Sequence, residues 1–438
     1  MNVILLSLDT VRADCLGAYG SADRNSPFID ALAKKSTVYL DALASSPWTL
    51  PSHASMFTGL YPSNHGSHCQ RVPFTDDMQT IAERLAAEGY ETLSFNGGGN
   101  VGATLGFGRG FARCRSFAFR AGSSDIRQYV RSNPLLPIEE GIAWIKAARG
   151  GGRGDRPPFF LFLHTYEVHS PYYSRRDDSF TSLEELKDLQ LSKDKGACAK
   201  ARRDYQGGLE WADRAVGELV RTLKASGLEE KTVLVLTSDH GEAFLEHGFV
   251  LHSIKLYSEF LRVPLIIFDP RHPVARASRK PASIVDIKPT LLDLLGMEVE
   301  PGMDGISLVR EVDDARCRFA EVCFDPGASN RLLRAGIVTL ADVSSKMIAQ
   351  KDKRLIFNDQ RGTVELYDVA ADPAMLTDLA GRDRAEAARL KAVLDKWIAS
   401  TRMGYDKPSR RQIRPSERGL PREQADQLRS LGYIGPEG

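Results

Sequence analysis

The chain has 438 residues, of which 42% are hydrophobic and 26% are charged, and its formal net charge is +1. This composition supports a large buried core, in one long α/β domain or in two or three smaller domains. The near-zero net charge argues against nucleic acid or an anionic membrane surface as the partner.

Cysteines and apolar runs indicate the compartment. The six cysteines are scattered and form no Cys-x-x-Cys pair, which favours reduced thiols over a disulfide framework or a zinc knuckle. The apolar run after Met1 has about six residues, too short for a secretory signal or a membrane span. No other run approaches the ~18 apolar residues of a span. We therefore expect a cytoplasmic protein without a membrane span; the sequence carries no signal for its oligomeric state.

The first predicted strand, Val3 to Leu8, is almost entirely apolar, which is typical of a strand buried on both faces. It ends at Asp9. Ligands of open α/β sheets bind at the carboxyl ends of strands, so Asp9 is a candidate site residue, with a helix-capping aspartate as the alternative. A helix over residues 26–35 and a strand over residues 37–42 are predicted next.

The stretch from Trp48 to Gly59 contains the candidate nucleophile, the hydroxyl of Thr49. Residues 52–58 are predicted to form a helix with Pro51 at its first turn. A helix N-terminus collects backbone N–H groups and favours an anion. The sequence therefore places Thr49 beside a favourable position for a charged group.

Predicted strands and helices alternate up to about residue 310. The strands cover 91–95, 159–163, 232–237 and 263–268, and the helices 78–88, 136–149, 184–224 and 286–295. Between them, Asn96 to Asn100 is glycine-rich and could let the backbone approach a ligand, although a plain loop is the favoured interpretation. Residues 149–158 are predicted to be a surface loop.

Polar clusters follow the predicted strands, which is typical of a parallel-rich sheet with one crevice. We predict an α/β protein with a large mixed, mostly parallel sheet flanked by helices, as a catalytic domain over residues 1–310. A smaller α+β subdomain over 311–400 would hold an antiparallel sheet (strands 318–324, 335–343, 346–349, 354–357 and 364–369) and a packed helix over 384–400. Residues 401–438 are charged and proline-bearing and are predicted to form an arm.

The polar residues at the strand ends suggest a divalent-metal site. A metal beside a hydroxyl lowers its pKa and holds it as a nucleophile. A single histidine at a strand end is usually just a hydrogen-bonding residue, but several at successive strand ends are harder to explain in that way. The collected residues are Asp9, Thr49, His164, His169, Asp239, His240 and His252.

These residues carry a resemblance to the sulfatase-like branch of the alkaline phosphatase superfamily. It covers nearly the whole chain and keeps the family's order. The segment from Thr49 to Pro62 resembles the sulfatase signature, and Asn2 to Gly20 resembles the opening metal-binding strand. The other matching segments are 160–172, 237–248, 256–265, 285–292, 365–368 and 428–433. The resemblance implies an alkaline-phosphatase-like fold and metal-dependent ester chemistry.

The sequence departs from true sulfatases at the nucleophile. There the first signature position is a Cys or Ser that is oxidised to formylglycine, whereas this chain has Thr49. Thr10 replaces one carboxylate of the usual Asp-Asp pair, His53 replaces an arginine, and the Gly-Lys-Trp-His segment is absent. These departures resemble the phosphoethanolamine and phosphoglycerol transferases and some phosphodiesterases, which use an unmodified Thr.

That resemblance implies one divalent metal ion held by Asp9, Thr49, Asp239 and His240, and no organic cofactor. The mixed ligand set favours Zn²⁺ or Mn²⁺, with Ca²⁺ or Mg²⁺ as alternatives. Thr49 would attack phosphorus in line and form a phospho-threonine intermediate. His252, twelve residues after His240, or His169 would protonate the leaving oxygen.

The remaining candidates would bind substrate: His53, His164, Asn96 or Asn100, and Lys255, for which a solvated helix lysine is the alternative. We expect a hydrolase or transferase acting on a phosphate ester through Thr49. The substrate would be a small-molecule, glycan-linked or lipid-linked phosphate or sulfate ester. One alternative is an arylsulfatase-like sulfuric ester hydrolase, and another is an inactive binding protein on the same fold.

Overall fold

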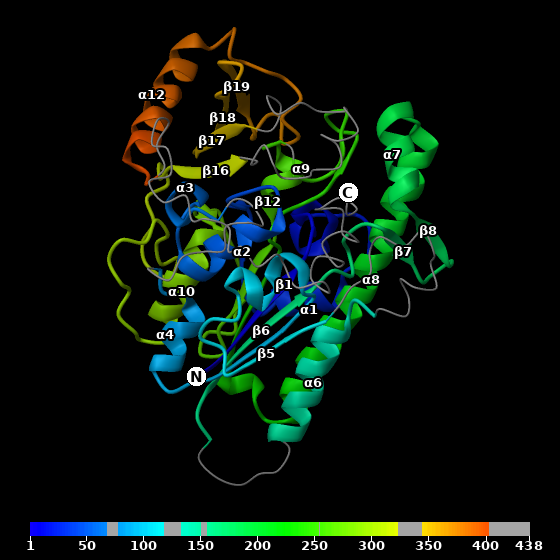
Figure 1. Cartoon of the computed structure of the whole chain (residues 1–438), viewed down its shortest axis with the longest axis vertical. Coiled ribbons are helices and arrows are strands. Elements are labelled where there is room, and N and C mark those ends of the chain that lie inside the picture. The colour runs from blue at the N-terminus through cyan, green and yellow to red at the C-terminus, as the bar shows by residue number, and fades with distance from the viewer. Residues whose placement is uncertain (68–77, 118–132, 150–155, 254, 323–343, 403–438) are drawn as a thin grey trace.

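The computed structural model describes residues 1–67, 78–117, 133–149, 156–253, 255–322 and 344–402 (Figure 1). The predicted strand over 335–343, most of the loop over 149–158 and nearly all of the arm over 401–438 lie outside the described residues.

An eight-stranded sheet runs through the molecule in the order β14-β2-β13-β9-β1-β6-β4-β5 (Figure 1). Strands β9, β1, β6, β4 and β5 pair in parallel, while β13 is antiparallel to β9 and β2. The predicted large, mostly parallel mixed sheet is confirmed. Its strands are β1 (Asn2–Leu8), β2 (Thr37–Tyr39), β4 (Glu91–Asn96), β5 (Arg113–Ser116), β6 (Phe159–Thr165), β9 (Thr232–Thr237), β13 (Leu265–Phe268) and β14 (Arg276–Ser278).

Both faces of the sheet are covered, because its central strands are apolar on both sides. On β1, Ile4 and Leu6 belong to one core, and Val3 and Leu5 belong to the other. The first core includes residues of α1 (Pro27–Ala33), α6 (Leu136–Arg149) and α8 (Lys195–Ala225). The second includes residues of α2 (Thr49–Thr58), α4 (Ile81–Ala87) and α10 (Ile287–Leu294).

Several predicted elements differ from the structure at their ends. The strand predicted over 263–268 divides at Pro264, which lacks the N–H that continues a ladder, into β12 (Arg262–Val263) and β13. Strand β12 joins β3 (Ala42–Leu43) and β15 (Ala282–Ser283) in a separate small sheet. The helical stretch 184–224 divides at Lys193, whose φ is 55°, into α7 (Leu183–Ser192) and α8.

Shorter elements connect these parts. They are α3 (Pro62–His65), α9 (Ser258–Leu261), β7 (Tyr172–Ser174), β8 (Ser179–Thr181), β10 (Ala243–Phe244), β11 (Val250–Leu251) and the 3-10 turns η1 (Ala13–Cys15), η2 (Gly17–Tyr19), η3 (Gly99–Val101), η4 (Ala103–Leu105), η5 (Glu229–Lys231) and η6 (Ile284–Asp286).

The C-terminal part is an antiparallel sheet in the order β16-β17-β18-β19, with one helix packed on it (Figure 1). On β17, Ile348 packs with Leu390 of the helix, while Met347 belongs to the core shared with α2. The predicted small antiparallel sheet is therefore confirmed, whereas a domain boundary at residue 310 stays a prediction. The elements are β16 (Arg318–Val322), β17 (Ser345–Gln350), β18 (Lys353–Asn358), β19 (Thr363–Asp368) and α12 (Arg384–Ser400).

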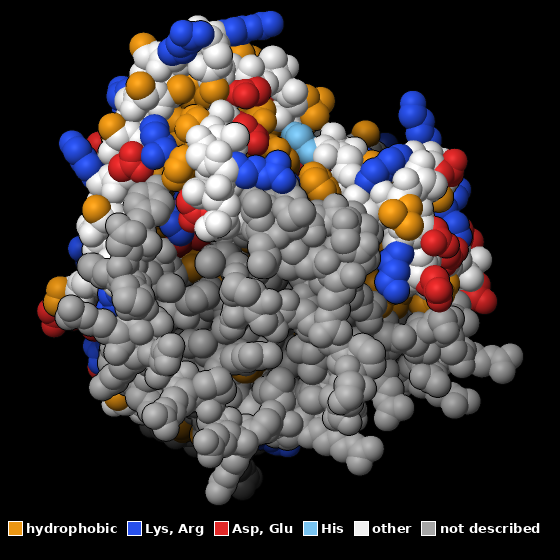
Figure 2. All heavy atoms as spheres, turned by 45° about the horizontal axis from the view of Figure 1, so that its top comes forward, with side chains coloured by type: hydrophobic (Ala, Val, Ile, Leu, Met, Phe, Trp, Pro, Cys, Tyr) orange, Lys and Arg blue, Asp and Glu red, His pale blue; other side chains and the backbone are white. Residues whose placement is uncertain are grey.

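Within the described residues, no helix is both long and apolar enough to cross a membrane. Figure 2 shows one face of the molecule, on which acidic and basic side chains are interspersed among the described residues. This mixture accords with the formal net charge of +1.

Candidate active site and metal centre

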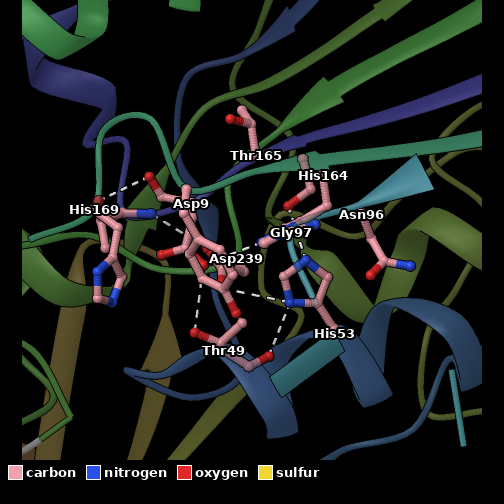
Figure 3. A network of polar contacts seen from close by, with 12 residues as sticks. Asp9, Thr49, His53, Asn96, Gly97, His164, Thr165, His169 and Asp239 are labelled. Carbon is pink, nitrogen blue, oxygen red and sulfur yellow. Dashed lines mark hydrogen bonds and ion pairs between the residues drawn. The ribbon is translucent and has the colours of Figure 1, made fainter. Parts of the chain in front are cut away.

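Three adjacent strands bring the central polar residues together. Asp9 follows β1, Asp239 and His240 follow β9, and His164 lies near the end of β6. Because these strands are parallel, their carboxyl ends meet at one edge of the sheet. Figure 3 shows Thr49 and the side chain of His53 reaching this edge from α2.

Asp9, Asp239 and His240 form a compact set of atoms that could bind a metal ion, which we call the metal-ligand set. One ligand atom from each lies within 4.8 Å of the other two, and all three residues are buried. Oδ1 of Asp9 and Oδ2 of Asp239 have no hydrogen-bond partner among the described residues. The Nδ1–H of His240 donates to the carbonyl of Gly241 at 2.9 Å, which leaves the lone pair on Nε2. Unpartnered buried carboxylate oxygens are costly without a cation, so these donors fit a divalent ion.

The two carboxylates perturb one another. Burial, and then the charge of Asp239, raises the pKa of Asp9 well above its usual value. Burial also acts to raise the pKa of Asp239, but His240, His53 and His164 outweigh it and lower that pKa. Two buried carboxylates this close do not readily ionise together, and a cation between them would remove the conflict.

Thr49 is the first residue of α2, three residues before the predicted helix start. Its Oγ1 lies 3.4 Å from Oδ2 of Asp9 and 3.4 Å from Nε2 of His240. The helix can begin here because Pro51 falls in the first turn, where backbone N–H groups have no intrahelical partner. All ten residues of α2 are buried, so packing fixes the position of the Thr49 hydroxyl.

His53 lies one turn further along α2 and contacts the site residues as a fully buried side chain. Its Nδ1–H donates to the carbonyl of Thr49 at 2.9 Å, and its Nε2 accepts from the hydroxyl of Ser7 at 3.0 Å. Nδ1 also lies 3.5 Å from Oδ2 of Asp239. Burial lowers the pKa of His53 to about 3, so the ring is neutral near pH 7. His53 therefore ties the start of α2 to β1 and β9.

His164 contacts a metal-ligand candidate directly. The N–H of Gly97 donates to its Nδ1 at 3.4 Å, so its Nε2–H donates to Oδ2 of Asp9 at 3.2 Å. Burial lowers the pKa of His164 to about 4. A Cβ at Gly97 would come within 2.4 Å of Tyr166 and 3.3 Å of Nδ1 of His164. The glycine thus admits the backbone N–H that orients His164, and His164 in turn orients Asp9.

A second group of residues lies beside the metal-ligand set. The rings of His169 and His252 have centroids 4.9 Å apart, and the ring of His252 is 4.5 Å from that of His240. Nδ1 of His252 lies 2.9 Å from Oε1 of Glu242, and Nδ1 of His169 donates to the carbonyl of Ser170 at 2.6 Å. The structure therefore brings both predicted acid candidates to the site.

Burial shifts the protonation of this second group. It lowers the pKa of His169 to about 3 and that of His252 to about 4, and it raises the pKa of Glu242 to about 7. Glu242 was missing from the predicted site residues, although it stands two positions after His240. That spacing, on a segment that leaves a buried strand, was the signal that could have identified it.

The two asparagines of the glycine-rich segment differ. The Nδ2 of Asn96 donates to Ser94 at 2.8 Å, and its Oδ1 accepts from the N–H of Gly98 at 2.9 Å. Asn100 is buried in η3, which packs against α2, and neither of its side-chain amide atoms has a partner among the described residues. Of the two, Asn100 is the one with unused hydrogen-bonding capacity. Lys255 is half-buried, with its Nζ 5.6 Å from the ring centroid of Phe249.

Thr10 follows Asp9 directly, and its backbone N–H donates to Oδ1 of Asp239 at 3.4 Å. Its Oγ1 donates to the carbonyl of Asp9 at 2.8 Å. Its φ of 60° is strained for a β-branched residue. The turn is held in place by Tyr205, whose hydroxyl donates to the carbonyl of Thr10 at 2.9 Å and accepts from the N–H of Arg12 at 3.0 Å.

Comparison with known proteins agrees with this geometry. A family model described as Sulfatase matches residues 1–297. The chain belongs to the sulfatase family, as the signature around Thr49 predicts.

Relatives and solved structures extend this likeness over most of the chain. The chain is 22% identical to an arylsulfatase of Clostridium perfringens, over 92% of this chain and 95% of that protein. It is 24% identical to a choline-sulfatase of Rhizobium meliloti, over 91% and 86% of the two chains. The structure of a phosphonate monoester hydrolase of Agrobacterium radiobacter aligns with a TM-score of 0.71 at 21% identity, over 90% and 94% of the chains. This structural likeness confirms the predicted fold.

Proposed function

We propose that the protein is a metal-dependent hydrolase or transferase that acts on a phosphate ester through a covalent intermediate on Thr49. The substrate would be a phosphodiester, or an ester carrying a phosphoethanolamine- or phosphoglycerol-type group. The observation that carries the proposal is the position of the Thr49 hydroxyl, 3.4 Å from both Asp9 and His240 at the start of a buried helix.

Asp9, Asp239, His240 and Thr49 would hold one divalent ion. When bound, such an ion supplies charge that lowers the pKa of the Thr49 hydroxyl and offsets charge on a phosphoryl oxygen. This ligand set of two carboxylates, one hydroxyl and one imidazole favours Zn²⁺ or Mn²⁺ over Ca²⁺. His164 orients Asp9 through the 3.2 Å contact, and His53 fixes the backbone of Thr49.

In the proposed reaction, the hydroxyl of Thr49 loses its proton to solvent, its Oγ1 forms a bond to phosphorus, and the bond from phosphorus to the leaving oxygen breaks. The leaving oxygen takes a proton from the pair formed by His252 and Glu242, with His169 as the neighbouring candidate. Burial keeps a proton on this pair near neutral pH, because it raises the pKa of Glu242 to about 7. Water or an acceptor alcohol then releases the group from Thr49.

Asn100 is our candidate for holding a non-bridging oxygen, since its buried amide has no partner among the described residues. The side-chain amide of Asn96 is already hydrogen-bonded to Ser94 and Gly98. Lys255 stays a second candidate, placed at the segment that carries His252.

The charge of the site suits a singly charged ester. A divalent ion would balance the two carboxylates of Asp9 and Asp239, so a monoanion enters a nearly neutral site more readily than a dianion. Phosphodiesters and sulfate monoesters are both monoanions. Sulfuric ester hydrolysis is therefore the second candidate, and it is favoured by the relatives that are named arylsulfatase and choline-sulfatase.

The experiment compares bis(4-nitrophenyl) phosphate with 4-nitrophenyl sulfate on the metal-loaded protein, because both release the same phenol. We expect faster turnover of the phosphodiester, and mass spectrometry should find nitrophenyl phosphate on the peptide that contains Thr49. Turnover of the sulfate alone would contradict the phosphoryl proposal. A purified protein that neither binds metal nor cleaves either ester would favour an inactive binding protein.

A further inference from the structure

A groove of about 1280 Å³ is lined by the segment before α1, the start of α1, the residues after β7 and helix α8, and none of its lining residues belongs to the metal-ligand set. We call it the Trp211 groove. Its lining contains five arginines and three carboxylates, in a chain whose formal net charge is only +1. The arginines are Arg24, Arg175, Arg176, Arg214 and Arg221.

The three carboxylates of the groove have partners in the protein. Asp213 accepts from the N–H groups of Phe28 and Ile29 at the start of α1. Glu210 lies 3.6 Å from Arg176, and Asp23 accepts from Gln206 at 2.5 Å. The lining carries two more guanidinium groups than carboxylates. Three of its arginines, Arg175, Arg176 and Arg221, already form ion pairs with carboxylates, which leaves Arg24 and Arg214 for a ligand.

The arginines are held on aromatic rings. The guanidinium carbons of Arg175 and Arg214 lie 5.0 and 4.8 Å from the ring centroid of Trp211, and that of Arg221 lies 5.2 Å from Phe28. Stacking of this kind uses the flat face of a guanidinium and leaves its in-plane N–H groups to bind oxyanions, often in pairs. In Arg175 and Arg221 these groups already donate to Glu167 and Glu218, so Arg214 is the stacked arginine that offers them to a ligand. Arg24 and Arg214 make no salt bridge with a carboxylate among the described residues.

We propose that the Trp211 groove binds the sulfate or phosphate groups of an anionic glycan. The fork of a guanidinium matches the oxygens of either group. Single-stranded nucleic acid fits less well, since its bases need open aromatic faces for stacking, and guanidinium groups lie over Trp211 and Phe28. The inference does not depend on which ester the metal site cleaves.

The groove is connected to the candidate active site by one short segment. Arg175 forms an ion pair with the buried carboxylate of Glu167, two residues before His169. The chain from His169 to Arg175 spans at most ~20 Å, even when fully extended. A glycan chain of that reach can therefore place one anionic group in the groove while another part lies near the catalytic residues.

The test measures binding of a size-defined sulfated dextran oligosaccharide to the full chain by isothermal titration calorimetry. The variant Arg24→Gln/Arg214→Gln removes the two arginines that lack a salt bridge. The matched control Arg382→Gln/Arg384→Gln removes the same charge from exposed positions near α12. We expect at least about tenfold weaker binding for the groove variant, because two charged hydrogen-bond donors are lost, and unchanged binding for the control.

Further binding measurements test where the oligosaccharide binds and which class of ligand the groove accepts. Thr49→Ala should bind the oligosaccharide like the wild type, unsulfated dextran should not bind, and Arg214→Glu should weaken binding more than the groove variant does. The proposal is overturned by wild-type affinity in the groove variant, or by loss of binding in Thr49→Ala. Equal affinity for a single-stranded DNA of the same charge, lost in the same groove variant, would also overturn it.

Discussion

Two regions of the molecule bury charged side chains: the metal-ligand set, and the contact between Asp41 and the C-terminal sheet. The two regions differ in how these charges are paired. In the contact, Asp41 Oδ2 lies 2.7 Å from Arg318 and 2.6 Å from Arg354, and the two arginines are almost fully buried. In the metal-ligand set, Asp9 and Asp239 face each other, and each keeps an oxygen without a partner among the described residues.

The same contrast extends to neighbouring groups. At the C-terminal sheet, Glu321 accepts from the N–H of Ser63 at 2.8 Å and from Lys346 at 3.1 Å. Near the metal-ligand set, the amide of Asn100 is buried without a partner among the described residues. At the C-terminal sheet the buried charges are paired with opposite charges, although Nε of Arg318 has no hydrogen-bond partner among the described residues. Pairs of opposite charge stabilise a fold, whereas facing like charges with unpartnered oxygens are typical of a ligand site.

The largest effect that tests this contrast is expected at Thr49. Thr49→Ala removes the proposed nucleophile without creating a buried charge, so kcat should fall by about 10⁴-fold or more while the folded state survives. Steady-state kinetics with a phosphodiester and a thermal melt measure both quantities. Thr49→Ser, which keeps a hydroxyl, is the control and should retain far more activity. Full activity of Thr49→Ala would remove the nucleophile from the proposal.

The half-buried Asp41 and the buried Asp9 should respond oppositely to substitution in the metal-free protein. Asp41→Asn breaks a pair with two buried arginines and should lower the free energy of unfolding by about 2 kcal/mol, a value reduced because Asp41 is 35% exposed. Asp9→Asn removes one of two facing carboxylates and should raise that free energy by about 1 kcal/mol. Urea unfolding in the presence of a chelator measures both.

Adding Zn²⁺ or Mn²⁺ should reveal a further difference in stability between these two variants. The wild type and Asp41→Asn should both gain stability from the metal, and Asp9→Asn should gain much less because it has lost a ligand. Equal destabilisation by the two substitutions, with the same response to metal, would show that the two regions do not differ in the way described.

A smaller effect is expected at Asn100. Asn100→Ala removes a buried amide that contacts substrate in the proposal, so kcat/KM should fall about tenfold, with little loss of stability. Asn96→Ala is the matched control, because its hydrogen bonds hold the backbone of Gly98 and it should lower stability instead. Enzyme kinetics and melting temperature, measured on both variants, separate the roles. The reverse pattern would assign substrate contact to Asn96.

The smallest effect concerns the pH dependence of the C-terminal contact. Nδ1 of His247 lies 2.7 Å from Glu259, and its Nε2 lies 2.9 Å from the carbonyl of Met375. Burial acts to lower the pKa of His247, but Glu259 outweighs it and raises that pKa. A raised histidine pKa adds stability that is fully present below ~6.5 and is lost as the pH rises through the folded-state value.

His247→Gln should therefore be less stable than the wild type at pH 6, and the difference should shrink by pH 8.5. Urea midpoints at the two pH values measure this change. His272→Gln is the matched control, since His272 is largely exposed and its ring lies against Asp269 instead of the C-terminal part. A difference between His247→Gln and the wild type that stays constant with pH would contradict a charged His247.

Sequence patterns predicted the buried strands well, because a strand covered on both faces must be apolar throughout. The strand over 232–237 and the helices over 136–149 and 384–400 agree with the structure residue by residue. The start of α2 was predicted three residues too late: Pro51 does lie in the first turn, but the helix already begins at Thr49. The break at Pro264 could have been predicted, because proline lacks the N–H that continues a ladder. That the two halves join different sheets could not, since it depends on strands far apart in the chain.

The candidate site could be predicted as a set of residue types at strand ends, but not as a set of contacts. Nothing in the local sequence says that His252 faces Glu242, or that Asn96 is used within its own segment while Asn100 is not. Those distinctions arise from packing between segments far apart in the chain. The glycine-rich segment was interpreted as a plain loop, yet Gly97 lies in contact distance of His164.

The burial of the whole of α2 has a consequence for how such a protein could acquire new substrates. The hydroxyl of Thr49, which is the nucleophile in our proposal, is held in one place, because Leu50, Phe57 and the other residues of the helix are packed in the core and His53 ties the helix to β1. Adaptation must then come from the segments that follow His169 and His252. A directed-evolution library for this scaffold should leave α2 and β1 unchanged and vary those segments.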